Sequence, residues 1–105
     1  MAEVNVLKFD CNNYLANLSL AKSCLDEYCF LKAIGYMRQA ISVDPSRPEA
    51  FNLLGACCEM FRRPLEAQKF YRAALVLEPA YGPAQRNLHR LVSYHKRGRV
   101  DFGAL

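Results

Sequence analysis

The fold of this chain is decided by residues 48–79, which read PEAFNLLGACCEMFRRPLEAQKFYRAALVLEP. Apolar and small side chains recur in this stretch at the spacing of a helix with one buried face. Proline-containing breaks flank it at 44–48 and 78–83, where proline suits the first turn of a helix but cannot continue one. The pattern predicts two helices, about 48–61 and 64–77.

The pattern of this stretch has a counterpart 34 residues earlier in the chain, since Asp44-Pro45 and Glu78-Pro79 are separated by that step. Other pairs at the same step are Ala33 and Ala67, Met37 and Tyr71, Ala40 and Ala74, Ile41 and Leu75, Leu20 and Leu54, Ala21 and Gly55, and Cys24 and Cys58. One further step aligns Leu88 and Val92 with Leu54 and Cys58. A fixed period of this length indicates stacked supersecondary units, with the small residues where two helices cross.

These residues resemble the tetratricopeptide repeat. The unit at 48–81 supplies the family's pattern with Phe51, Leu54, Gly55, Cys58, Ala67, Tyr71 and Pro79. The unit at 14–47 departs from the pattern at Asn17, and the partial unit at 82–95 departs from it at Gln85 and His89. The resemblance spans about 14–95 and implies an all-α fold, a short α-α superhelix of stacked antiparallel helices.

Five helices are expected, at about 14–28, 30–43, 48–61, 64–77 and 83–96, with Asn13 and Ser46 among the candidate N-caps. The expected organisation is an N-terminal segment at 1–13, a first repeat at 14–47, a second at 48–81, a capping helix at 82–96 and a tail at 97–105. The N-terminal segment is expected to cover one end of the stack. Disorder is one expectation for the tail.

The chain has 105 residues, of which 52% are hydrophobic and 23% charged, so it falls in the globular class. No apolar run is long enough to cross a membrane, and the start does not read as a secretory signal. The five cysteines form no regular framework, which favours reduced thiols and a cytoplasmic location. Nine basic and nine acidic residues cancel over 1–81, so the net charge of +4 arises entirely from 82–105.

No residue pattern in the sequence suggests an enzyme. Cys57 and Cys58 are interpreted as packing residues, because adjacent cysteines on a helix point about 100° apart and no second pair accompanies them. His89 and His95 are six residues apart and do not share a helical face. The five glycines are scattered and form no phosphate-binding loop. No catalytic residue, metal or cofactor is therefore expected.

The resemblance implies a protein-binding adaptor or scaffold, because in the family the first helix of each repeat lines a concave groove for a peptide or helix. By position, the partner-binding residues are Leu15, Leu18, Ser19, Lys22, Asn52, Leu53, Ala56, Glu59, Met60, Arg86, Asn87 and Arg90, with Tyr94 a further candidate. The family's carboxylate clamp for chaperone C-termini falls on Leu18, Lys22, Leu53, Pro83 and Asn87, none of which matches it. The basic end of this groove favours an acidic peptide.

Two other modes of action remain open at this stage. With two and a half repeats, an incompletely covered end could stack on a second copy, which would make the chain a homo-oligomeric scaffold. Nucleic-acid contact through residues 95–99, which read HKRGR, is disfavoured because such short basic runs are common in solvated tails. No membrane partner is expected.

Overall fold

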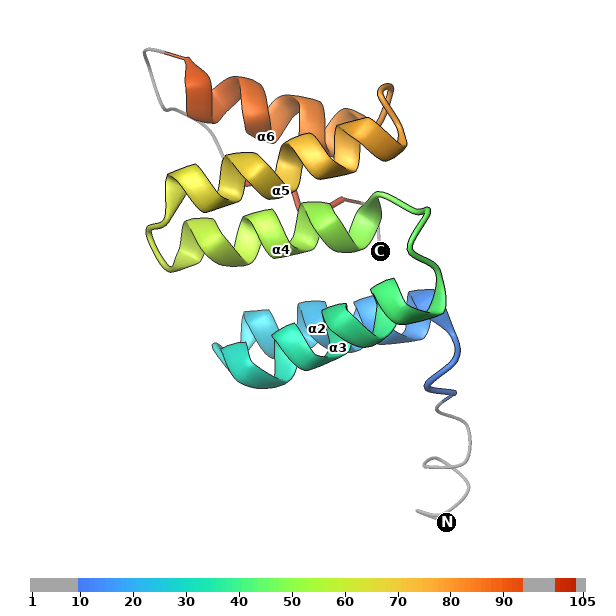
Figure 1. Ribbon diagram of the computed structural model, residues 1–105. Helices are drawn as coiled ribbons and strands as arrows, with labels where there is room; N and C mark the ends of the chain where they lie inside the picture. Colours follow the sequence, from blue (N-terminus) through green and yellow to red (C-terminus); the bar gives the residue numbers. More distant parts are fainter. Residues whose placement is uncertain (1–9, 94–99, 104–105) are drawn as a thin grey trace. The chain divides into compact units, whose positions relative to one another are not determined.

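The computed structural model describes residues 10–93 and 100–103 (Figure 1). Over these residues the chain is all-helical, with no strand, as the periodicity predicts. The five helices found there are α2 (Tyr14–Asp26), α3 (Phe30–Val43), α4 (Glu49–Met60), α5 (Pro64–Leu77) and α6 (Gly82–Val92). The expected covering segment at the N-terminus lies mostly outside the described residues.

The helices form two units, which are considered separately. The first unit extends to Pro45 and packs α2 against α3. Its core consists of wholly or almost wholly buried side chains, namely Tyr14, Leu18, Ala21, Leu25, Ala33, Met37 and Ala40. The second unit begins at Ser46 and packs α5 against both α4 and α6. Its core cluster contains Ala67, Tyr71, Ala74, Ala84 and Leu91.

The first helix of each hairpin ends in the same way. The pairing of residues at the 34-residue step did not predict this structural repeat. Tyr28 follows α2 with a φ of 60°, and Arg62 follows α4 with a φ of 59°. After each, the next residue donates its N–H back into the helix, Cys29 to the Cys24 carbonyl at 2.7 Å and Arg63 to the Cys58 carbonyl at 2.9 Å. This is the Schellman arrangement, in which glycine is the usual left-handed residue. Because neither Tyr28 nor Arg62 is glycine, the sequence did not predict a helix end of this kind.

The starts and ends of the other helices follow local chemistry. Asn13 caps α2 as expected, with its side chain accepting from the Ala16 N–H at 3.0 Å. Ser46 is not the cap of α4, since that position belongs to Pro48. The last helix is shorter than predicted and stops at Val92, where the Ser93 backbone turns to an extended conformation. The remainder of the predicted helix, 94–96, lies outside the described residues.

Gly55 on α4 packs directly against Tyr71 on α5. A Cβ built on Gly55 would meet the Tyr71 ring, 2.6 Å from its Cδ1 and 2.8 Å from its Cζ, closer than any real side chains approach. The ring is itself completely buried, so it has no room to move aside. The small residue at this crossing, expected from the sequence, is therefore required by the aromatic ring that fills the space opposite it.

We predict that Gly55→Ala lowers the free energy of unfolding by about 1–3 kcal/mol, because the added methyl overpacks against Tyr71. Gly35→Ala is the matched control, since Gly35 also lies inside a helix but a Cβ there meets nothing within 4 Å. This second change should stabilise by about 0.5–1 kcal/mol through helix propensity alone. Urea unfolding followed by circular dichroism measures both, and equal effects would contradict the packing explanation.

Candidate peptide-binding site

A pair of buried asparagines joins α4 to α6 in the second unit. Asn87 donates from its Nδ2 to the Oδ1 of Asn52 at 3.0 Å, and neither side chain is accessible to solvent. Buried amides must find hydrogen-bonding partners, because leaving one unpaired costs about 1–3 kcal/mol. The remaining groups of this asparagine pair, Asn52 and Asn87, find their partners on a segment of chain that follows α6.

That segment contains Asp101, whose two backbone groups are both bound by the asparagine pair. The Asp101 N–H donates to the Oδ1 of Asn87 at 2.7 Å, and the Asp101 carbonyl accepts from the Nδ2 of Asn87 at 2.7 Å. The same carbonyl accepts from the Nδ2 of Asn52 at 3.0 Å. The Asn87 side chain thus hydrogen-bonds both the N–H and the carbonyl of one residue, as a neighbouring β-strand does. Such recognition depends on the backbone and not on the identity of the bound side chain.

Arg86 adds recognition of charge. Its Nε and Nη2 lie 2.8 Å and 2.6 Å from the Oδ2 of Asp101. Partial burial alone would raise the pKa of Asp101, but the hydrogen bond from the Gly103 N–H and the Arg86 guanidinium lower it on balance. The Arg86 side chain is 65% exposed, so solvent weakens this pair. The guanidinium nevertheless places two nitrogen atoms on one oxygen of the Asp101 carboxylate.

Gly103 shapes the same segment. Its N–H donates to the Oδ1 of Asp101 at 2.9 Å, which closes an Asx turn two residues long. Its φ of 83° is one that side chains rarely adopt, and a Cβ there would lie 2.7 Å from the Tyr81 hydroxyl. Both the turn and the close approach therefore require glycine at this position. Residues 100–103 are accordingly held against the second unit, which corrects the expectation of disorder for that part of the tail.

A network of charged and hydrogen-bonding side chains lies next to the asparagine pair, because the Nη2 of Arg90 is 3.5 Å from the Oδ1 of Asn87. Glu59 on α4 and Arg90 on α6 form an ion pair at 2.6 Å, with side chains only 10% and 12% exposed. Tyr71 on α5 donates its hydroxyl to the same Glu59 oxygen at 2.5 Å. Burial, then this hydrogen bond, raises the pKa of Tyr71, and the hydrogen bond with Glu59 raises the pKa of Arg90. Tyr71 therefore stays neutral and Arg90 stays charged across the physiological range.

We predict that Arg90→Met lowers the free energy of unfolding by about 3–5 kcal/mol, because Glu59 is left buried without its counter-charge. Arg63→Met is the control, since Arg63 pairs with Glu66 at 3.3 Å on the surface, where the two side chains are 69% and 45% exposed. That loss should stay under about 1 kcal/mol. Chemical unfolding of both variants checks the difference, and a small effect at Arg90 would show that the buried pair adds little.

The predicted groove residues of the second unit divide into three groups. Asn52, Asn87 and Arg86 meet at Asp101, as described. Glu59 and Arg90 bind each other. Arg90 was expected to bind a partner, but its guanidinium is paired within the chain. Leu53 and Ala56 are completely buried and cannot be exposed groove residues, while Met60 is half-buried. Sequence reasoning missed Asp101, Gly103 and the Tyr71 hydroxyl, since nothing in a helical repeat pattern marks a tail as part of a site.

The four residues predicted from the first unit do not gather into a site. Leu18 is completely buried, contrary to its expected exposure, whereas Leu15 is 49% exposed and Ser19 is exposed. Lys22 forms a surface pair with Asp26 at 3.8 Å. Tyr94, the further candidate on the last helix, lies outside the described residues.

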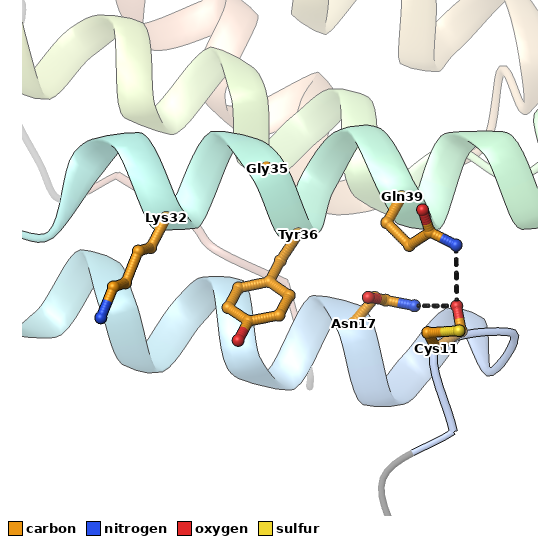
Figure 2. Close-up of a pocket in the computed structure, with 6 residues that line it drawn as sticks. All are labelled: Cys11, Asn17, Lys32, Gly35, Tyr36 and Gln39. Atoms are coloured by element: carbon orange, nitrogen blue, oxygen red, sulfur yellow. Dashed lines mark hydrogen bonds between the residues drawn. The ribbon is translucent and has the colours of Figure 1, made fainter.

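The first unit instead has a surface pocket of about 420 Å³ (Figure 2). At one end of it the Cys11 carbonyl accepts from Asn17 at 2.9 Å and from Gln39 at 3.0 Å. The Oδ1 of the buried Asn17 finds no hydrogen-bonding partner within the described part of the chain. None of the four predicted groove residues lines this pocket, whose lining consists of Cys11, Asn17, Lys32, Gly35, Tyr36 and Gln39.

The cysteines behave as packing and surface residues. Cys57 is buried and Cys58 packs against the core of the second unit, while Cys11 and Cys29 are exposed. Burial, then the neighbouring Cys58, raises the pKa of the Cys57 thiol to about 11. Burial also raises the pKa of Cys58, followed by Glu66, against a lowering by Arg63. Among the described residues no group of His, Cys, Asp and Glu is arranged to hold a metal ion.

We predict that iodoacetamide at pH 8 modifies Cys11 and Cys29 at least about tenfold faster than Cys57, because only a thiolate reacts and burial keeps Cys57 protonated. Quenched labelling followed by peptide mass spectrometry measures each rate. In denaturant the rates should converge. Fast labelling of Cys57 in the folded chain would contradict its burial.

Comparison with protein-family models and with curated proteins finds no match for this chain. None of the described helices combines the length and apolar character needed to cross a bilayer. The residues that converge on Asp101 offer hydrogen bonds to a backbone and a guanidinium to a carboxylate. These groups can hold an extended acidic peptide, and they provide no nucleophile paired with a base.

Proposed function

We propose that this chain is a protein-interaction module of the tetratricopeptide-repeat type, an adaptor or scaffold that binds an extended acidic peptide of a partner protein. The observation that carries the proposal is the binding of both backbone groups of Asp101 by the asparagine pair, together with the Arg86–Asp101 ion pair. Any peptide with an acidic residue at that position presents the same three groups. A partner peptide of this kind can therefore form the same backbone hydrogen bonds and ion pair that Asp101 forms within the chain.

Structural repetition supports the family assignment within this proposal. Left-handed Tyr28 and Arg62 are separated by the same 34-residue step that relates Ala21 to Gly55. In both hairpins, therefore, the first helix ends and the second helix begins at positions that are 34 residues apart in the sequence. The proposed cytoplasmic location is based on the sequence, in which the five cysteines form no regular framework.

Preorganisation supports peptide binding as the role of the asparagine pair. Asn52 and Asn87 are fixed by their mutual hydrogen bond, and Arg90 places its Nη2 3.5 Å from the Asn87 Oδ1. Donors that are already oriented lose little entropy when a ligand binds. Backbone recognition with one charge-selective position is typical of modules that bind extended segments.

We predict that display selection of random peptides on the immobilised chain enriches sequences containing Asp or Glu. Arg86→Glu should weaken the selected peptides about fivefold to tenfold, because an attractive exposed pair becomes a repulsive one. Arg72→Glu is the matched control, since it makes the same charge change at an exposed position on α5, apart from the site. Fluorescence anisotropy measures both affinities. Enrichment without acidic residues, or equal affinities for the two variants, would contradict the proposal.

Self-assembly into a homo-oligomeric scaffold is the second candidate. Large apolar side chains lie exposed on both units, including Leu31 at 87%, Leu65 at 69% and Val76 at 80%. Burying each would contribute about 1.5–3 kcal/mol, so several together could hold two copies. Light scattering over a range of concentrations distinguishes the candidates, because a monomer at all concentrations excludes this one.

A further inference from the structure

The peptide in the candidate site belongs to the same chain. Asp101 lies 14 residues beyond Asn87 and 49 beyond Asn52, yet it satisfies both asparagine side chains. Its carboxylate is paired with Arg86 at 2.6 Å. A partner peptide that used these groups would have to take the place of Asp101, because Asn87 already uses both its Oδ1 and its Nδ2 on that one residue.

We infer that Asp101-Phe102-Gly103 occupies, as an internal ligand, the place of the partner peptide, so that the site selects an Asp-X-Gly segment and opens only when this tail is displaced. The inference rests on the proposed function and adds to it both the sequence chosen and the way in which access is controlled.

Two contacts set the sequence rule. Arg86 requires an acidic side chain, and aspartate is short enough to accept from the N–H two residues on, as Asp101 does from Gly103 at 2.9 Å. Gly103 has a φ of 83°, and a Cβ there would lie 2.7 Å from the Tyr81 hydroxyl. Glycine is therefore selected two positions after the aspartate. The residue between them, Phe102, is half-buried and is not fixed by either contact.

Displacement follows from the burial of the asparagine pair. If the tail leaves, Asn52 and Asn87 lose the acceptor that they share, and Asn87 also loses a donor. A ligand with the same backbone groups restores these bonds in the same geometry. The apparent affinity for that ligand is then the intrinsic affinity multiplied by the fraction of molecules whose tail is undocked. Tail docking thus sets a threshold concentration for the partner.

The first experiment detects docking in the full chain. In nitrogen-15 NMR spectra, the side-chain amide signals of Asn52 and Asn87 report their bonds to the Asp101 carbonyl. Asp101→Arg places two cations together and should shift both signals. Asp26→Arg is the matched control, because it makes the same change at an exposed position at the end of α2, and should shift neither. Unchanged asparagine signals in Asp101→Arg would overturn the inference.

The second experiment measures occupancy with a labelled hexapeptide of the tail sequence, VDFGAL. It should bind the Asp101→Arg chain roughly tenfold tighter than the unaltered chain, because the internal competitor is removed. Peptides VNFGAL and VDFAAL test the rule, and each should bind that variant about fivefold more weakly than VDFGAL. Equal binding of all three peptides would overturn the Asp-X-Gly rule.

The remaining outcomes separate this inference from the proposed function. Equal affinity of VDFGAL for the unaltered chain and Asp101→Arg would overturn internal occupancy while leaving a peptide-binding site in place. Failure of VDFGAL to bind either chain would overturn the ligand assignment, whereas the display selection judges the proposed function independently. If the unaltered chain is a dimer that Asp101→Arg dissociates, the tail docks in a second copy and the internal assignment is wrong.

Discussion

The close approach of α4 and α5 at Gly55 is the constraint on which the second unit depends. Because Gly55 has no side chain, the buried Tyr71 ring packs directly against it. This packing fixes the position of the Tyr71 hydroxyl. That hydroxyl donates to Glu59, which also binds Arg90 on α6. One glycine thereby connects apolar packing between two helices to the polar contacts that position a third.

Those polar contacts do more than hold α6. A buried ion pair is weak evidence for stability, because removing two charges from water costs several kcal/mol per ion. Its clearer effect here is geometrical, since Glu59 with Arg90 and Asn52 with Asn87 fix the register of α6 along α4. Asn87 and Arg86 on the same helix bind the backbone and the carboxylate of Asp101. The residues that orient the helix therefore also hold the peptide segment.

The organisation of this site explains why some of its residues could be predicted and others could not. Asn52, Asn87 and Arg86 were expected in the groove from their helix positions, and all three contact Asp101, but Asn52 and Asn87 are completely buried. Leu18, Leu53 and Ala56 were expected in the groove but are buried, since an offset of a single residue rotates a side chain by about 100° around the helix and can move it from the rim to the core. Arg90 was expected among the partner-binding residues, but it pairs with Glu59, which lies 31 residues away on another helix. Periodicity cannot identify such a pair.

By itself the sequence determined the all-helical class, the positions of the helices to within a few residues and the need for small side chains at Gly55, Ala21, Ala33 and Ala67. These features depend on local spacing, on proline and on side-chain size, which the order of residues states directly. Only the tertiary structure decided that Asp101 returns to the asparagine pair and that Tyr71 joins the ion pair. Both are contacts between distant segments, and their formation depends on which buried polar groups still lack a partner once the helices have packed.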